Sequence, residues 1–180
     1  MHQTLYVLVY PSRLFAAHWS FWIPYLDGSG QESDTGDRIH VTGDRLNGFQ
    51  YEYVRDYNVC EDERKPNSFA IGLLSTASIS GGTEDDHRTS GVAAEETDAF
   101  NAFDRACREV QAPGPSLNKV MKTDGGKATG PPSRKTELRD CQWWVKQAVA
   151  RLVEADMLLP LDEGQGAGTP SEKVEGLPRH

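Results

Sequence analysis

Five segments in the first half of the chain carry the apolar patterns of β-strands, and they cover residues 4–10, 18–25, 37–42, 49–58 and 68–79. In the second segment, apolar positions 19, 21 and 23 alternate with His18, Ser20 and Trp22, as in a strand whose two faces meet different surroundings. The Asn47-Gly48 pair is a strong turn signal between the third and fourth segments. Because the connecting loops are short, the pattern predicts antiparallel pairing of neighbouring strands.

The hydrophobic period changes in the second half of the chain. Apolar side chains recur at helical spacing over residues 95–111, and a longer apolar stripe predicts a helix over residues 141–155. Residues 119–134, rich in Gly, Pro, Lys and Ser, predict a mobile loop. A sheet followed by helices indicates an α+β fold. We expect one α+β domain over residues 1–160, with a flexible acidic tail of Gly and Pro over residues 161–180.

Composition narrows the functional classes. The chain has 180 residues, with 19 basic and 27 acidic side chains and a net charge of -8. This balance argues against a nucleic-acid partner, because phosphate binding depends on Lys and Arg. No apolar run approaches the ~20 residues of a transmembrane helix, and the first apolar run predicts a strand, not a secretion signal. Three cysteines without paired spacing do not make a disulfide framework, so we expect a reducing, cytoplasmic location.

Three side chains could form a reactive centre. His18 and His40 both lie on the polar face of a predicted strand, so a hairpin between the strands would let the imidazoles approach each other. Cys141 follows Asp140 at the predicted start of a helix, where the helix dipole favours a thiolate. Nucleophile, base and orienting group are the parts of a thiol-dependent active site, and Cys141, His18 and His40 could fill these roles in that order. The other histidines lie at the termini or in an acidic loop.

Other interpretations of these residues stay open at this point. A buried Cys on an apolar helix stripe is usually part of the core, and a strand His beside Trp often has only a structural role. The three side chains could also bind a catalytic zinc ion, although no fixed spacing supports such a site. Large aromatic residues near the candidates could line an apolar pocket, but most such residues pack in cores. No phosphate-binding loop is present, and we expect no metal and no cofactor.

Three stretches resemble a known enzyme family. The segments 18–22 (HWSFW) and 38–41 (RIHV) resemble the "HWAIYV … VIHL" signature of enzymes related to lecithin:retinol acyltransferase, and 140–145 (DCQWWV) resembles their "NCEHFV" motif. That family belongs to the circularly permuted, NlpC-type branch of the papain-like cysteine enzymes. The order His, His, Cys is the permuted order. Residues 39–57 are also similar to an uncharacterised group of fungal proteins of about this size.

The resemblance implies a permuted papain-like fold in which Cys141 is the nucleophile, His18 the general base and His40 the orienting residue. Five further residues in the same motif blocks are candidates for substrate binding: Trp19, Ser20, Trp22, Gln142 and Trp144. The sequence departs from the family in a longer loop between the histidine strands, in Asp140 where the relatives have Asn, and in lacking a hydrophobic C-terminal anchor. The resemblance therefore supports the fold and the nucleophile better than a lipid substrate.

These observations predict a thiol-dependent hydrolase or acyltransferase that acts on a small-molecule or acyl substrate containing an ester, amide or thioester. One alternative is an enzyme of small-metabolite biosynthesis, of the isomerase, cyclase or lyase type, that uses the same pocket for acid–base chemistry. A second alternative is a non-catalytic binding protein on the same fold. The sequence leaves the oligomeric state open.

Overall fold

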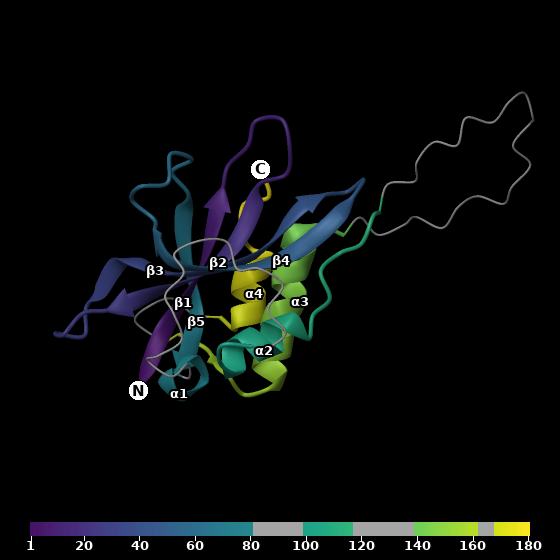
Figure 1. Cartoon of the computed structure of the whole chain (residues 1–180). Coiled ribbons are helices and arrows are strands. Elements are labelled where there is room, and N and C mark those ends of the chain that lie inside the picture. Colours follow the sequence, from purple (N-terminus) through teal and green to yellow (C-terminus); the bar gives the residue numbers. More distant parts are fainter. Residues whose placement is uncertain (81–98, 117–138, 162–167) are drawn as a thin grey trace, which may run out of the picture.

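A computed structural model of the chain describes residues 1–80, 99–116, 139–161 and 168–180. Its centre is one six-stranded antiparallel sheet with strand order β4-β3-β2-β1-β5-β6. The strands are β1 (His2–Tyr10), β2 (His18–Leu26), β3 (Glu32–Asp44), β4 (Gly48–Asn58), β5 (Asn67–Ser75) and β6 (Leu158–Leu159). Figure 1 shows helices gathered on one side of this sheet. The α+β class and the antiparallel pairing predicted from the sequence are confirmed.

In the described part of the chain, four helices accompany the sheet: α1 (Thr76–Ile79), α2 (Ala102–Arg108), α3 (Cys141–Glu154) and α4 (Pro170–Glu175). Asn101 caps α2 by accepting a hydrogen bond from the Asp104 N–H, as short polar side chains do at helix starts. The prediction of a helix over 141–155 is confirmed. None of the helices in the described residues is long and apolar enough to span a bilayer.

The two faces of the sheet differ in what they contact. On the inner face, defined here as the side carrying α2, α3 and α4, odd-numbered residues of β2 such as Trp19 and Phe21 join the main core with Trp144 of α3. The outer face carries a smaller cluster around Leu8, Tyr10 and Trp22. The alternation in β2 therefore separates two environments within one strand.

Several boundaries differ from the predictions. The strand expected over 68–79 ends at Ser75, and the chain turns into α1. The helix expected over 95–111 covers only Ala102–Arg108, while residues 95–98 and the predicted loop at 119–134 lie outside the described residues. β6 was not predicted, because a two-residue strand is defined by its pairing with β5 and has no pattern of its own.

The prediction of a flexible tail is wrong for residues 168–180. Thr169 and Glu172 form a reciprocal capping box around Pro170, and this opens α4. Val174 and Leu177 are then buried in the main core. The Arg179 carbonyl accepts a 2.9 Å hydrogen bond from the Ala17 N–H, which brings the C-terminal segment to the start of β2 (Figure 1). The last residues of the chain are therefore part of the domain.

Candidate functional site

Cys141 is the first residue of α3, and its position is fixed by the preceding residue. The Asp140 carboxylate caps the helix by accepting hydrogen bonds from the N–H groups of Gln142 at 3.0 Å and Trp143 at 3.1 Å. The same carboxylate makes a 2.6 Å ion pair with Arg45 from the turn between β3 and β4. The cap and the ion pair together anchor the start of α3 to the neighbouring hairpin.

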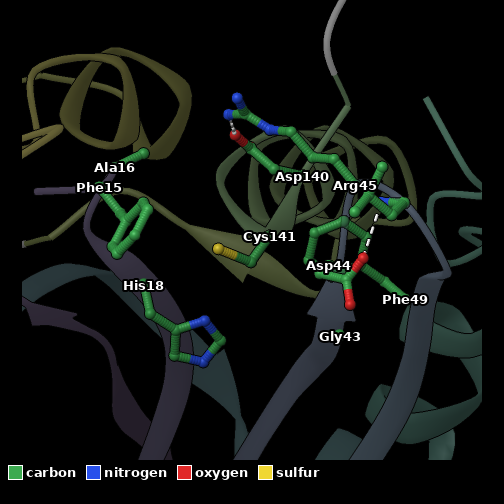
Figure 2. A pocket seen from close by; sticks show the side chains of 10 residues that line it. Phe15, Ala16, His18, Gly43, Asp44, Arg45, Phe49, Asp140 and Cys141 are labelled. Carbon is green, nitrogen blue, oxygen red and sulfur yellow. Dashed lines mark hydrogen bonds and ion pairs between the residues drawn. The ribbon is translucent and has the colours of Figure 1, made fainter. Parts of the chain in front are cut away.

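A cavity of about 480 Å³ opens beside Cys141. Its walls come from the loop before β2, the end of β3 with the following turn, and the start of α3. The lining residues are Phe15, Ala16, His18, Gly43, Asp44, Arg45, Leu46, Phe49, Asp140 and Cys141. Figure 2 shows the Cys141 sulfur and the His18 ring bordering the same space, with Phe15 beside them. The structure thus brings two of the three predicted reactive residues into one pocket.

Gly43 forms a narrow part of the pocket wall. Its φ angle of 138° lies in a region that side-chain-bearing residues rarely adopt. A Cβ atom at this position would collide with the Gly48 carbonyl oxygen across the hairpin. The close pairing of the two strands at this end therefore depends on glycine.

The two histidines are in direct contact. His18 Nε2 and His40 Nδ1 are 2.9 Å apart, and the rings meet edge to face. Both side chains extend from the outer-face positions of β2 and β3, as the alternation predicts. His40 is almost fully buried, with 4% exposure, so its ring holds His18 in a fixed orientation.

Cys141 and His18 are not an ion pair in this structure. Among the described residues, the thiol makes no hydrogen bond to His18, and its sulfur lies 4.0 Å from the Ala17 carbonyl oxygen. Burial raises the pKa of the Cys141 thiol to about 11, and the nearby Asp140 charge adds to this increase. Burial lowers the pKa of His18 to about 4, and the positive charges of Arg38 and Arg64 lower it further. Both groups are therefore neutral near pH 7, and the expected thiolate stabilisation by the helix dipole is outweighed by burial.

His40 has two further partners that the sequence analysis missed. Its Nε2 atom lies 3.0 Å from the Glu52 carboxylate and 3.2 Å from the Arg38 guanidinium. His40 and Glu52 are directly opposite each other in the β3–β4 ladder. The turn signal at Asn47-Gly48 marks where the hairpin turns but does not give this register. A two-residue loop at 47–48 would pair Leu46 with Phe49, whereas the structure pairs Asp44 with Gly48.

Arg38 is held by an aromatic and acidic network on the outer face. Its guanidinium lies 4.6 Å from the centre of the Tyr57 ring, 3.4 Å from the Tyr10 hydroxyl and 3.9 Å from the Asp62 carboxylate. Tyr57 donates a 2.7 Å hydrogen bond to Asp62, which also pairs with Arg64 at 2.6 Å. The positive charge next to the histidines is therefore fixed in position.

The five predicted substrate-binding residues do not line the pocket. Trp19 and Trp144 are fully buried, and their indole N–H groups donate to the backbone carbonyls of Pro178 and Val110, respectively. Gln142 donates to the carbonyls of Ala17 and Arg179. Ser20 and Trp22 are buried on the outer face, and their polar side-chain atoms have no hydrogen-bond partner among the described residues. These residues have structural positions, and their role in substrate binding stays a prediction.

Over the described ranges, no three His, Cys, Asp or Glu side chains form a group that could hold a metal ion. The zinc alternative needs His18, His40 and Cys141 around one ion, and this geometry is not found among those residues.

Comparison with known proteins adds one relationship. The model of a family described as "Family of unknown function (DUF6540)" matches residues 5–159. The chain belongs to the DUF6540 family. The match includes the pocket residues, the histidine pair and Glu52, whereas α4 lies beyond it. No curated protein and no solved structure matches the chain. The function of this DUF6540 member must therefore be argued from the pocket itself.

Proposed function

We propose that this DUF6540 protein is a thiol-dependent hydrolase or acyltransferase with Cys141 as nucleophile, His18 as general base and His40 as the orienting residue. The observation that carries the proposal is that Cys141 and His18 border one pocket, while His40 is within hydrogen-bond distance of the His18 ring and orients it. A nucleophile, a base and a group that orients the base are the parts required for acyl transfer through a covalent intermediate.

In the proposed reaction, the Cys141 sulfur attacks the carbonyl carbon of an ester, amide or thioester. The thiol proton passes to His18, which then donates it to the leaving oxygen, nitrogen or sulfur as the acyl-enzyme forms. A water molecule or a second nucleophile, deprotonated by His18, attacks the thioester and releases Cys141. The Cys141 N–H lies in the first helical turn, where an N–H needs a partner from outside the helix, and it is the candidate donor to the oxyanion.

Because the Cys141 thiol and the His18 imidazole are both neutral, their protonation states determine when the proton is transferred in this mechanism. A thiol with a pKa of about 11 beside an imidazole with a pKa of about 4 stores no preformed thiolate. Proton transfer must therefore accompany the attack on the substrate, as in general base catalysis. The apolar surfaces of Phe15, Leu46 and Phe49 in the pocket wall favour a substrate with an apolar part next to the reacting carbonyl.

The proposed fold relationship is to the permuted papain-like enzymes. The order of His18, His40 and Cys141 along the chain, the two histidine strands and the helix beginning at the cysteine support it.

Cys141→Ala tests the nucleophile. With a panel of p-nitrophenyl and thioester substrates, we expect hydrolysis to fall by about 10³-fold or more, because the covalent route is lost. Cys60→Ser is the matched control, because Cys60 is exposed and far from the pocket in the chain fold. Intact-mass spectrometry should detect an acyl adduct that depends on Cys141. Unchanged turnover in Cys141→Ala at an unchanged melting temperature would remove the proposal.

A second candidate keeps the pocket but has no covalent step. It is supported by the neutral thiol and neutral imidazole, which could act as an acid and a base on a small metabolite of the kind handled by isomerases, cyclases or lyases. In that case Cys141→Ala and His18→Ala would both abolish turnover, but no adduct would appear on Cys141. Absence of both turnover and a Cys141 adduct across the substrate panel would favour a non-catalytic binding protein instead.

A further inference from the structure

His40 Nε2 lies between two groups, one of which requires it to carry a proton while the other requires it to carry none. The Glu52 carboxylate, 3.0 Å away, can only accept a hydrogen bond, whereas the Arg38 guanidinium, 3.2 Å away, can only donate one. A neutral imidazole carries a single proton on one of its two nitrogens. His40 therefore satisfies Glu52 in one tautomer and Arg38 in the other.

The tautomer of His40 determines the tautomer of His18. If His40 carries its proton on Nε2 and donates to Glu52, then its Nδ1 accepts the hydrogen bond from His18 Nε2–H across 2.9 Å. His18 Nδ1 then has a free lone pair. If Arg38 donates to His40 Nε2 instead, the proton of His40 moves to Nδ1 and is donated to His18 Nε2, and the proton of His18 must then sit on Nδ1.

Only the first arrangement gives His18 a basic nitrogen in the pocket. Its Nε2 atom is occupied by His40, so Nδ1 is the nitrogen that remains for chemistry beside Cys141. Figure 2 shows the His18 ring directed into the same space as the Cys141 sulfur. The second arrangement would present an N–H there, which can donate a proton but cannot accept one from the thiol.

We infer that Glu52 is a positioning residue which, through His40, sets the tautomer that makes His18 a general base, with Arg38 opposing it. This inference rests on the proposed function of Cys141 and His18. Two observations favour Glu52 in the competition. Its carboxylate is the nearer group and accepts a charge-assisted hydrogen bond, whereas Arg38 is shared with Tyr10, Tyr57 and Asp62. Glu52 also stabilises the positive charge that reaches His18 when the thiol proton is transferred.

Nitrogen-15 NMR of the histidine rings tests the tautomer without any substrate. At pH 7 we expect His18 protonated at Nε2 and unprotonated at Nδ1, and His40 protonated at Nε2. In Glu52→Ala, Arg38 has no competitor, so both rings should change to the Nδ1–H form. Glu32→Ala is the matched control, because Glu32, in β3, is also a strand glutamate that accepts a side-chain hydrogen bond, from Tyr6 of β1, but it is not bonded to His40. An Nδ1–H form of His18 in the unmodified protein, or an unchanged tautomer in Glu52→Ala, would overturn the inference.

The reactivity of Cys141 provides a second measurement. In a Cys60→Ser background, the rate of iodoacetamide alkylation of Cys141 at pH 7 should fall about tenfold in Glu52→Ala, the change made by one pKa unit of the base. Arg38→Met in the same protein should restore part of the rate, whereas a merely structural role of Glu52 predicts no such rescue. The rate should be followed from pH 5 to 9, because Tyr10, Arg38, Glu52, Arg64 and Cys141 all face the histidine pair from different elements.

The two proposals fail in different ways. If Cys141→Ala keeps full turnover while the tautomers follow Glu52, then the nucleophile is wrong and the coupling is right. If Cys141 is essential but the tautomers ignore Glu52, then the inference about Glu52 is wrong and the nucleophile stands.

Discussion

The inner and outer faces of the sheet are formed by the same strands, but their polar side chains have different kinds of bonding partner. On the inner face, the polar groups of Trp19, Gln142 and Trp144 donate to backbone carbonyls and are otherwise surrounded by apolar side chains. On the outer face, imidazoles, a guanidinium and carboxylates bond to one another. Those carbonyl partners are uncharged, whereas the outer-face groups include charged side chains and two imidazole rings that can change tautomer. The inner side also holds a buried ion pair, between Asp104 and Arg108 of α2.

The two faces meet at the start of β2. Ala17 bonds to the C-terminal segment, His18 extends toward the pocket and Trp19 enters the core. Three consecutive residues thus have different roles: the Ala17 backbone is anchored, the His18 side chain borders the pocket, and the Trp19 side chain is packed in the core. Perturbing one face at a time should separate stability from reactivity.

The largest effect should follow removal of residues 168–180. The deletion takes Val174 and Leu177 out of the core, leaves the donors of Ala17 and Trp19 without their acceptors, and removes one of the two acceptors of Gln142. We expect the free energy of unfolding, measured in urea, to fall by about 5 kcal/mol. Deleting His180 alone keeps the Arg179 carbonyl and is the matched control. Equal stability of both shortened proteins would show that the C-terminal segment does not support the inner face.

The outer face should make stability dependent on pH. The pKa of His18 is about 4 in the folded protein and near 6.5 when unfolded, so between these values the unfolded chain binds more protons. The free energy of unfolding should therefore decrease as the pH is lowered from 7 to 4, by on the order of 2 kcal/mol from His18 alone. Urea unfolding at a series of pH values, compared with His18→Gln, measures this contribution. An equally steep decrease in His18→Gln would assign the effect to other groups.

Two tryptophans on opposite faces of β2 allow a direct comparison. Trp19→Phe removes the N–H that donates to Pro178, whereas Trp22→Phe removes an N–H that has no partner among the described residues. The ring volume lost is the same in both. We expect Trp19→Phe to be the more destabilising by about 1 kcal/mol, the net value of one hydrogen bond. A larger loss of stability in Trp22→Phe would contradict the difference described between the faces.

The smallest effect is expected at the junction, from Asp140→Asn. Asn keeps the helix cap but removes the negative charge that raises the pKa of the Cys141 thiol. Alkylation of Cys141 at pH 8 should become about threefold faster, as for half a pKa unit. Asp140→Ala removes the charge and the cap together, so its additional loss of stability, about 1 kcal/mol, reports the cap. A slower reaction in Asp140→Asn would mean that the ion pair with Arg45 controls access to the thiol.

Local patterns predicted the elements that depend on local signals. Alternation located β2 and the later part of β3, and the apolar stripe located α3, because each buries one regular face. α4 was missed because its segment is rich in Gly, Pro and Glu, and only Val174 and Leu177 reach the core. Its capping box of Thr169 and Glu172 was nevertheless a readable signal.

The candidate site also contains some contacts that local sequence patterns could predict and others that they could not. The contact of His18 with His40 follows from strand parity and a single hairpin register. The pocket wall does not, since Phe15 in the β1–β2 loop and Phe49 at the start of β4 line it through the tertiary fold and not through any spacing in the sequence. Trp19 and Trp144 were chosen for their aromatic character beside the motif residues, but packing required those rings on the inner face. Glu52 was missed because it lies four pairs along the β3–β4 ladder from Asp44 and Gly48, in a register that the turn signal alone does not give.

The division of β2 between the two faces has a consequence for saturation mutagenesis. Substitutions at 19, 21 and 23 should reduce the amount of folded protein in cells, whereas tolerated substitutions at 18 should leave abundance intact and alter only chemistry. A library that scores abundance and labelling in parallel would therefore separate position 18 from the buried positions that follow it in the same strand.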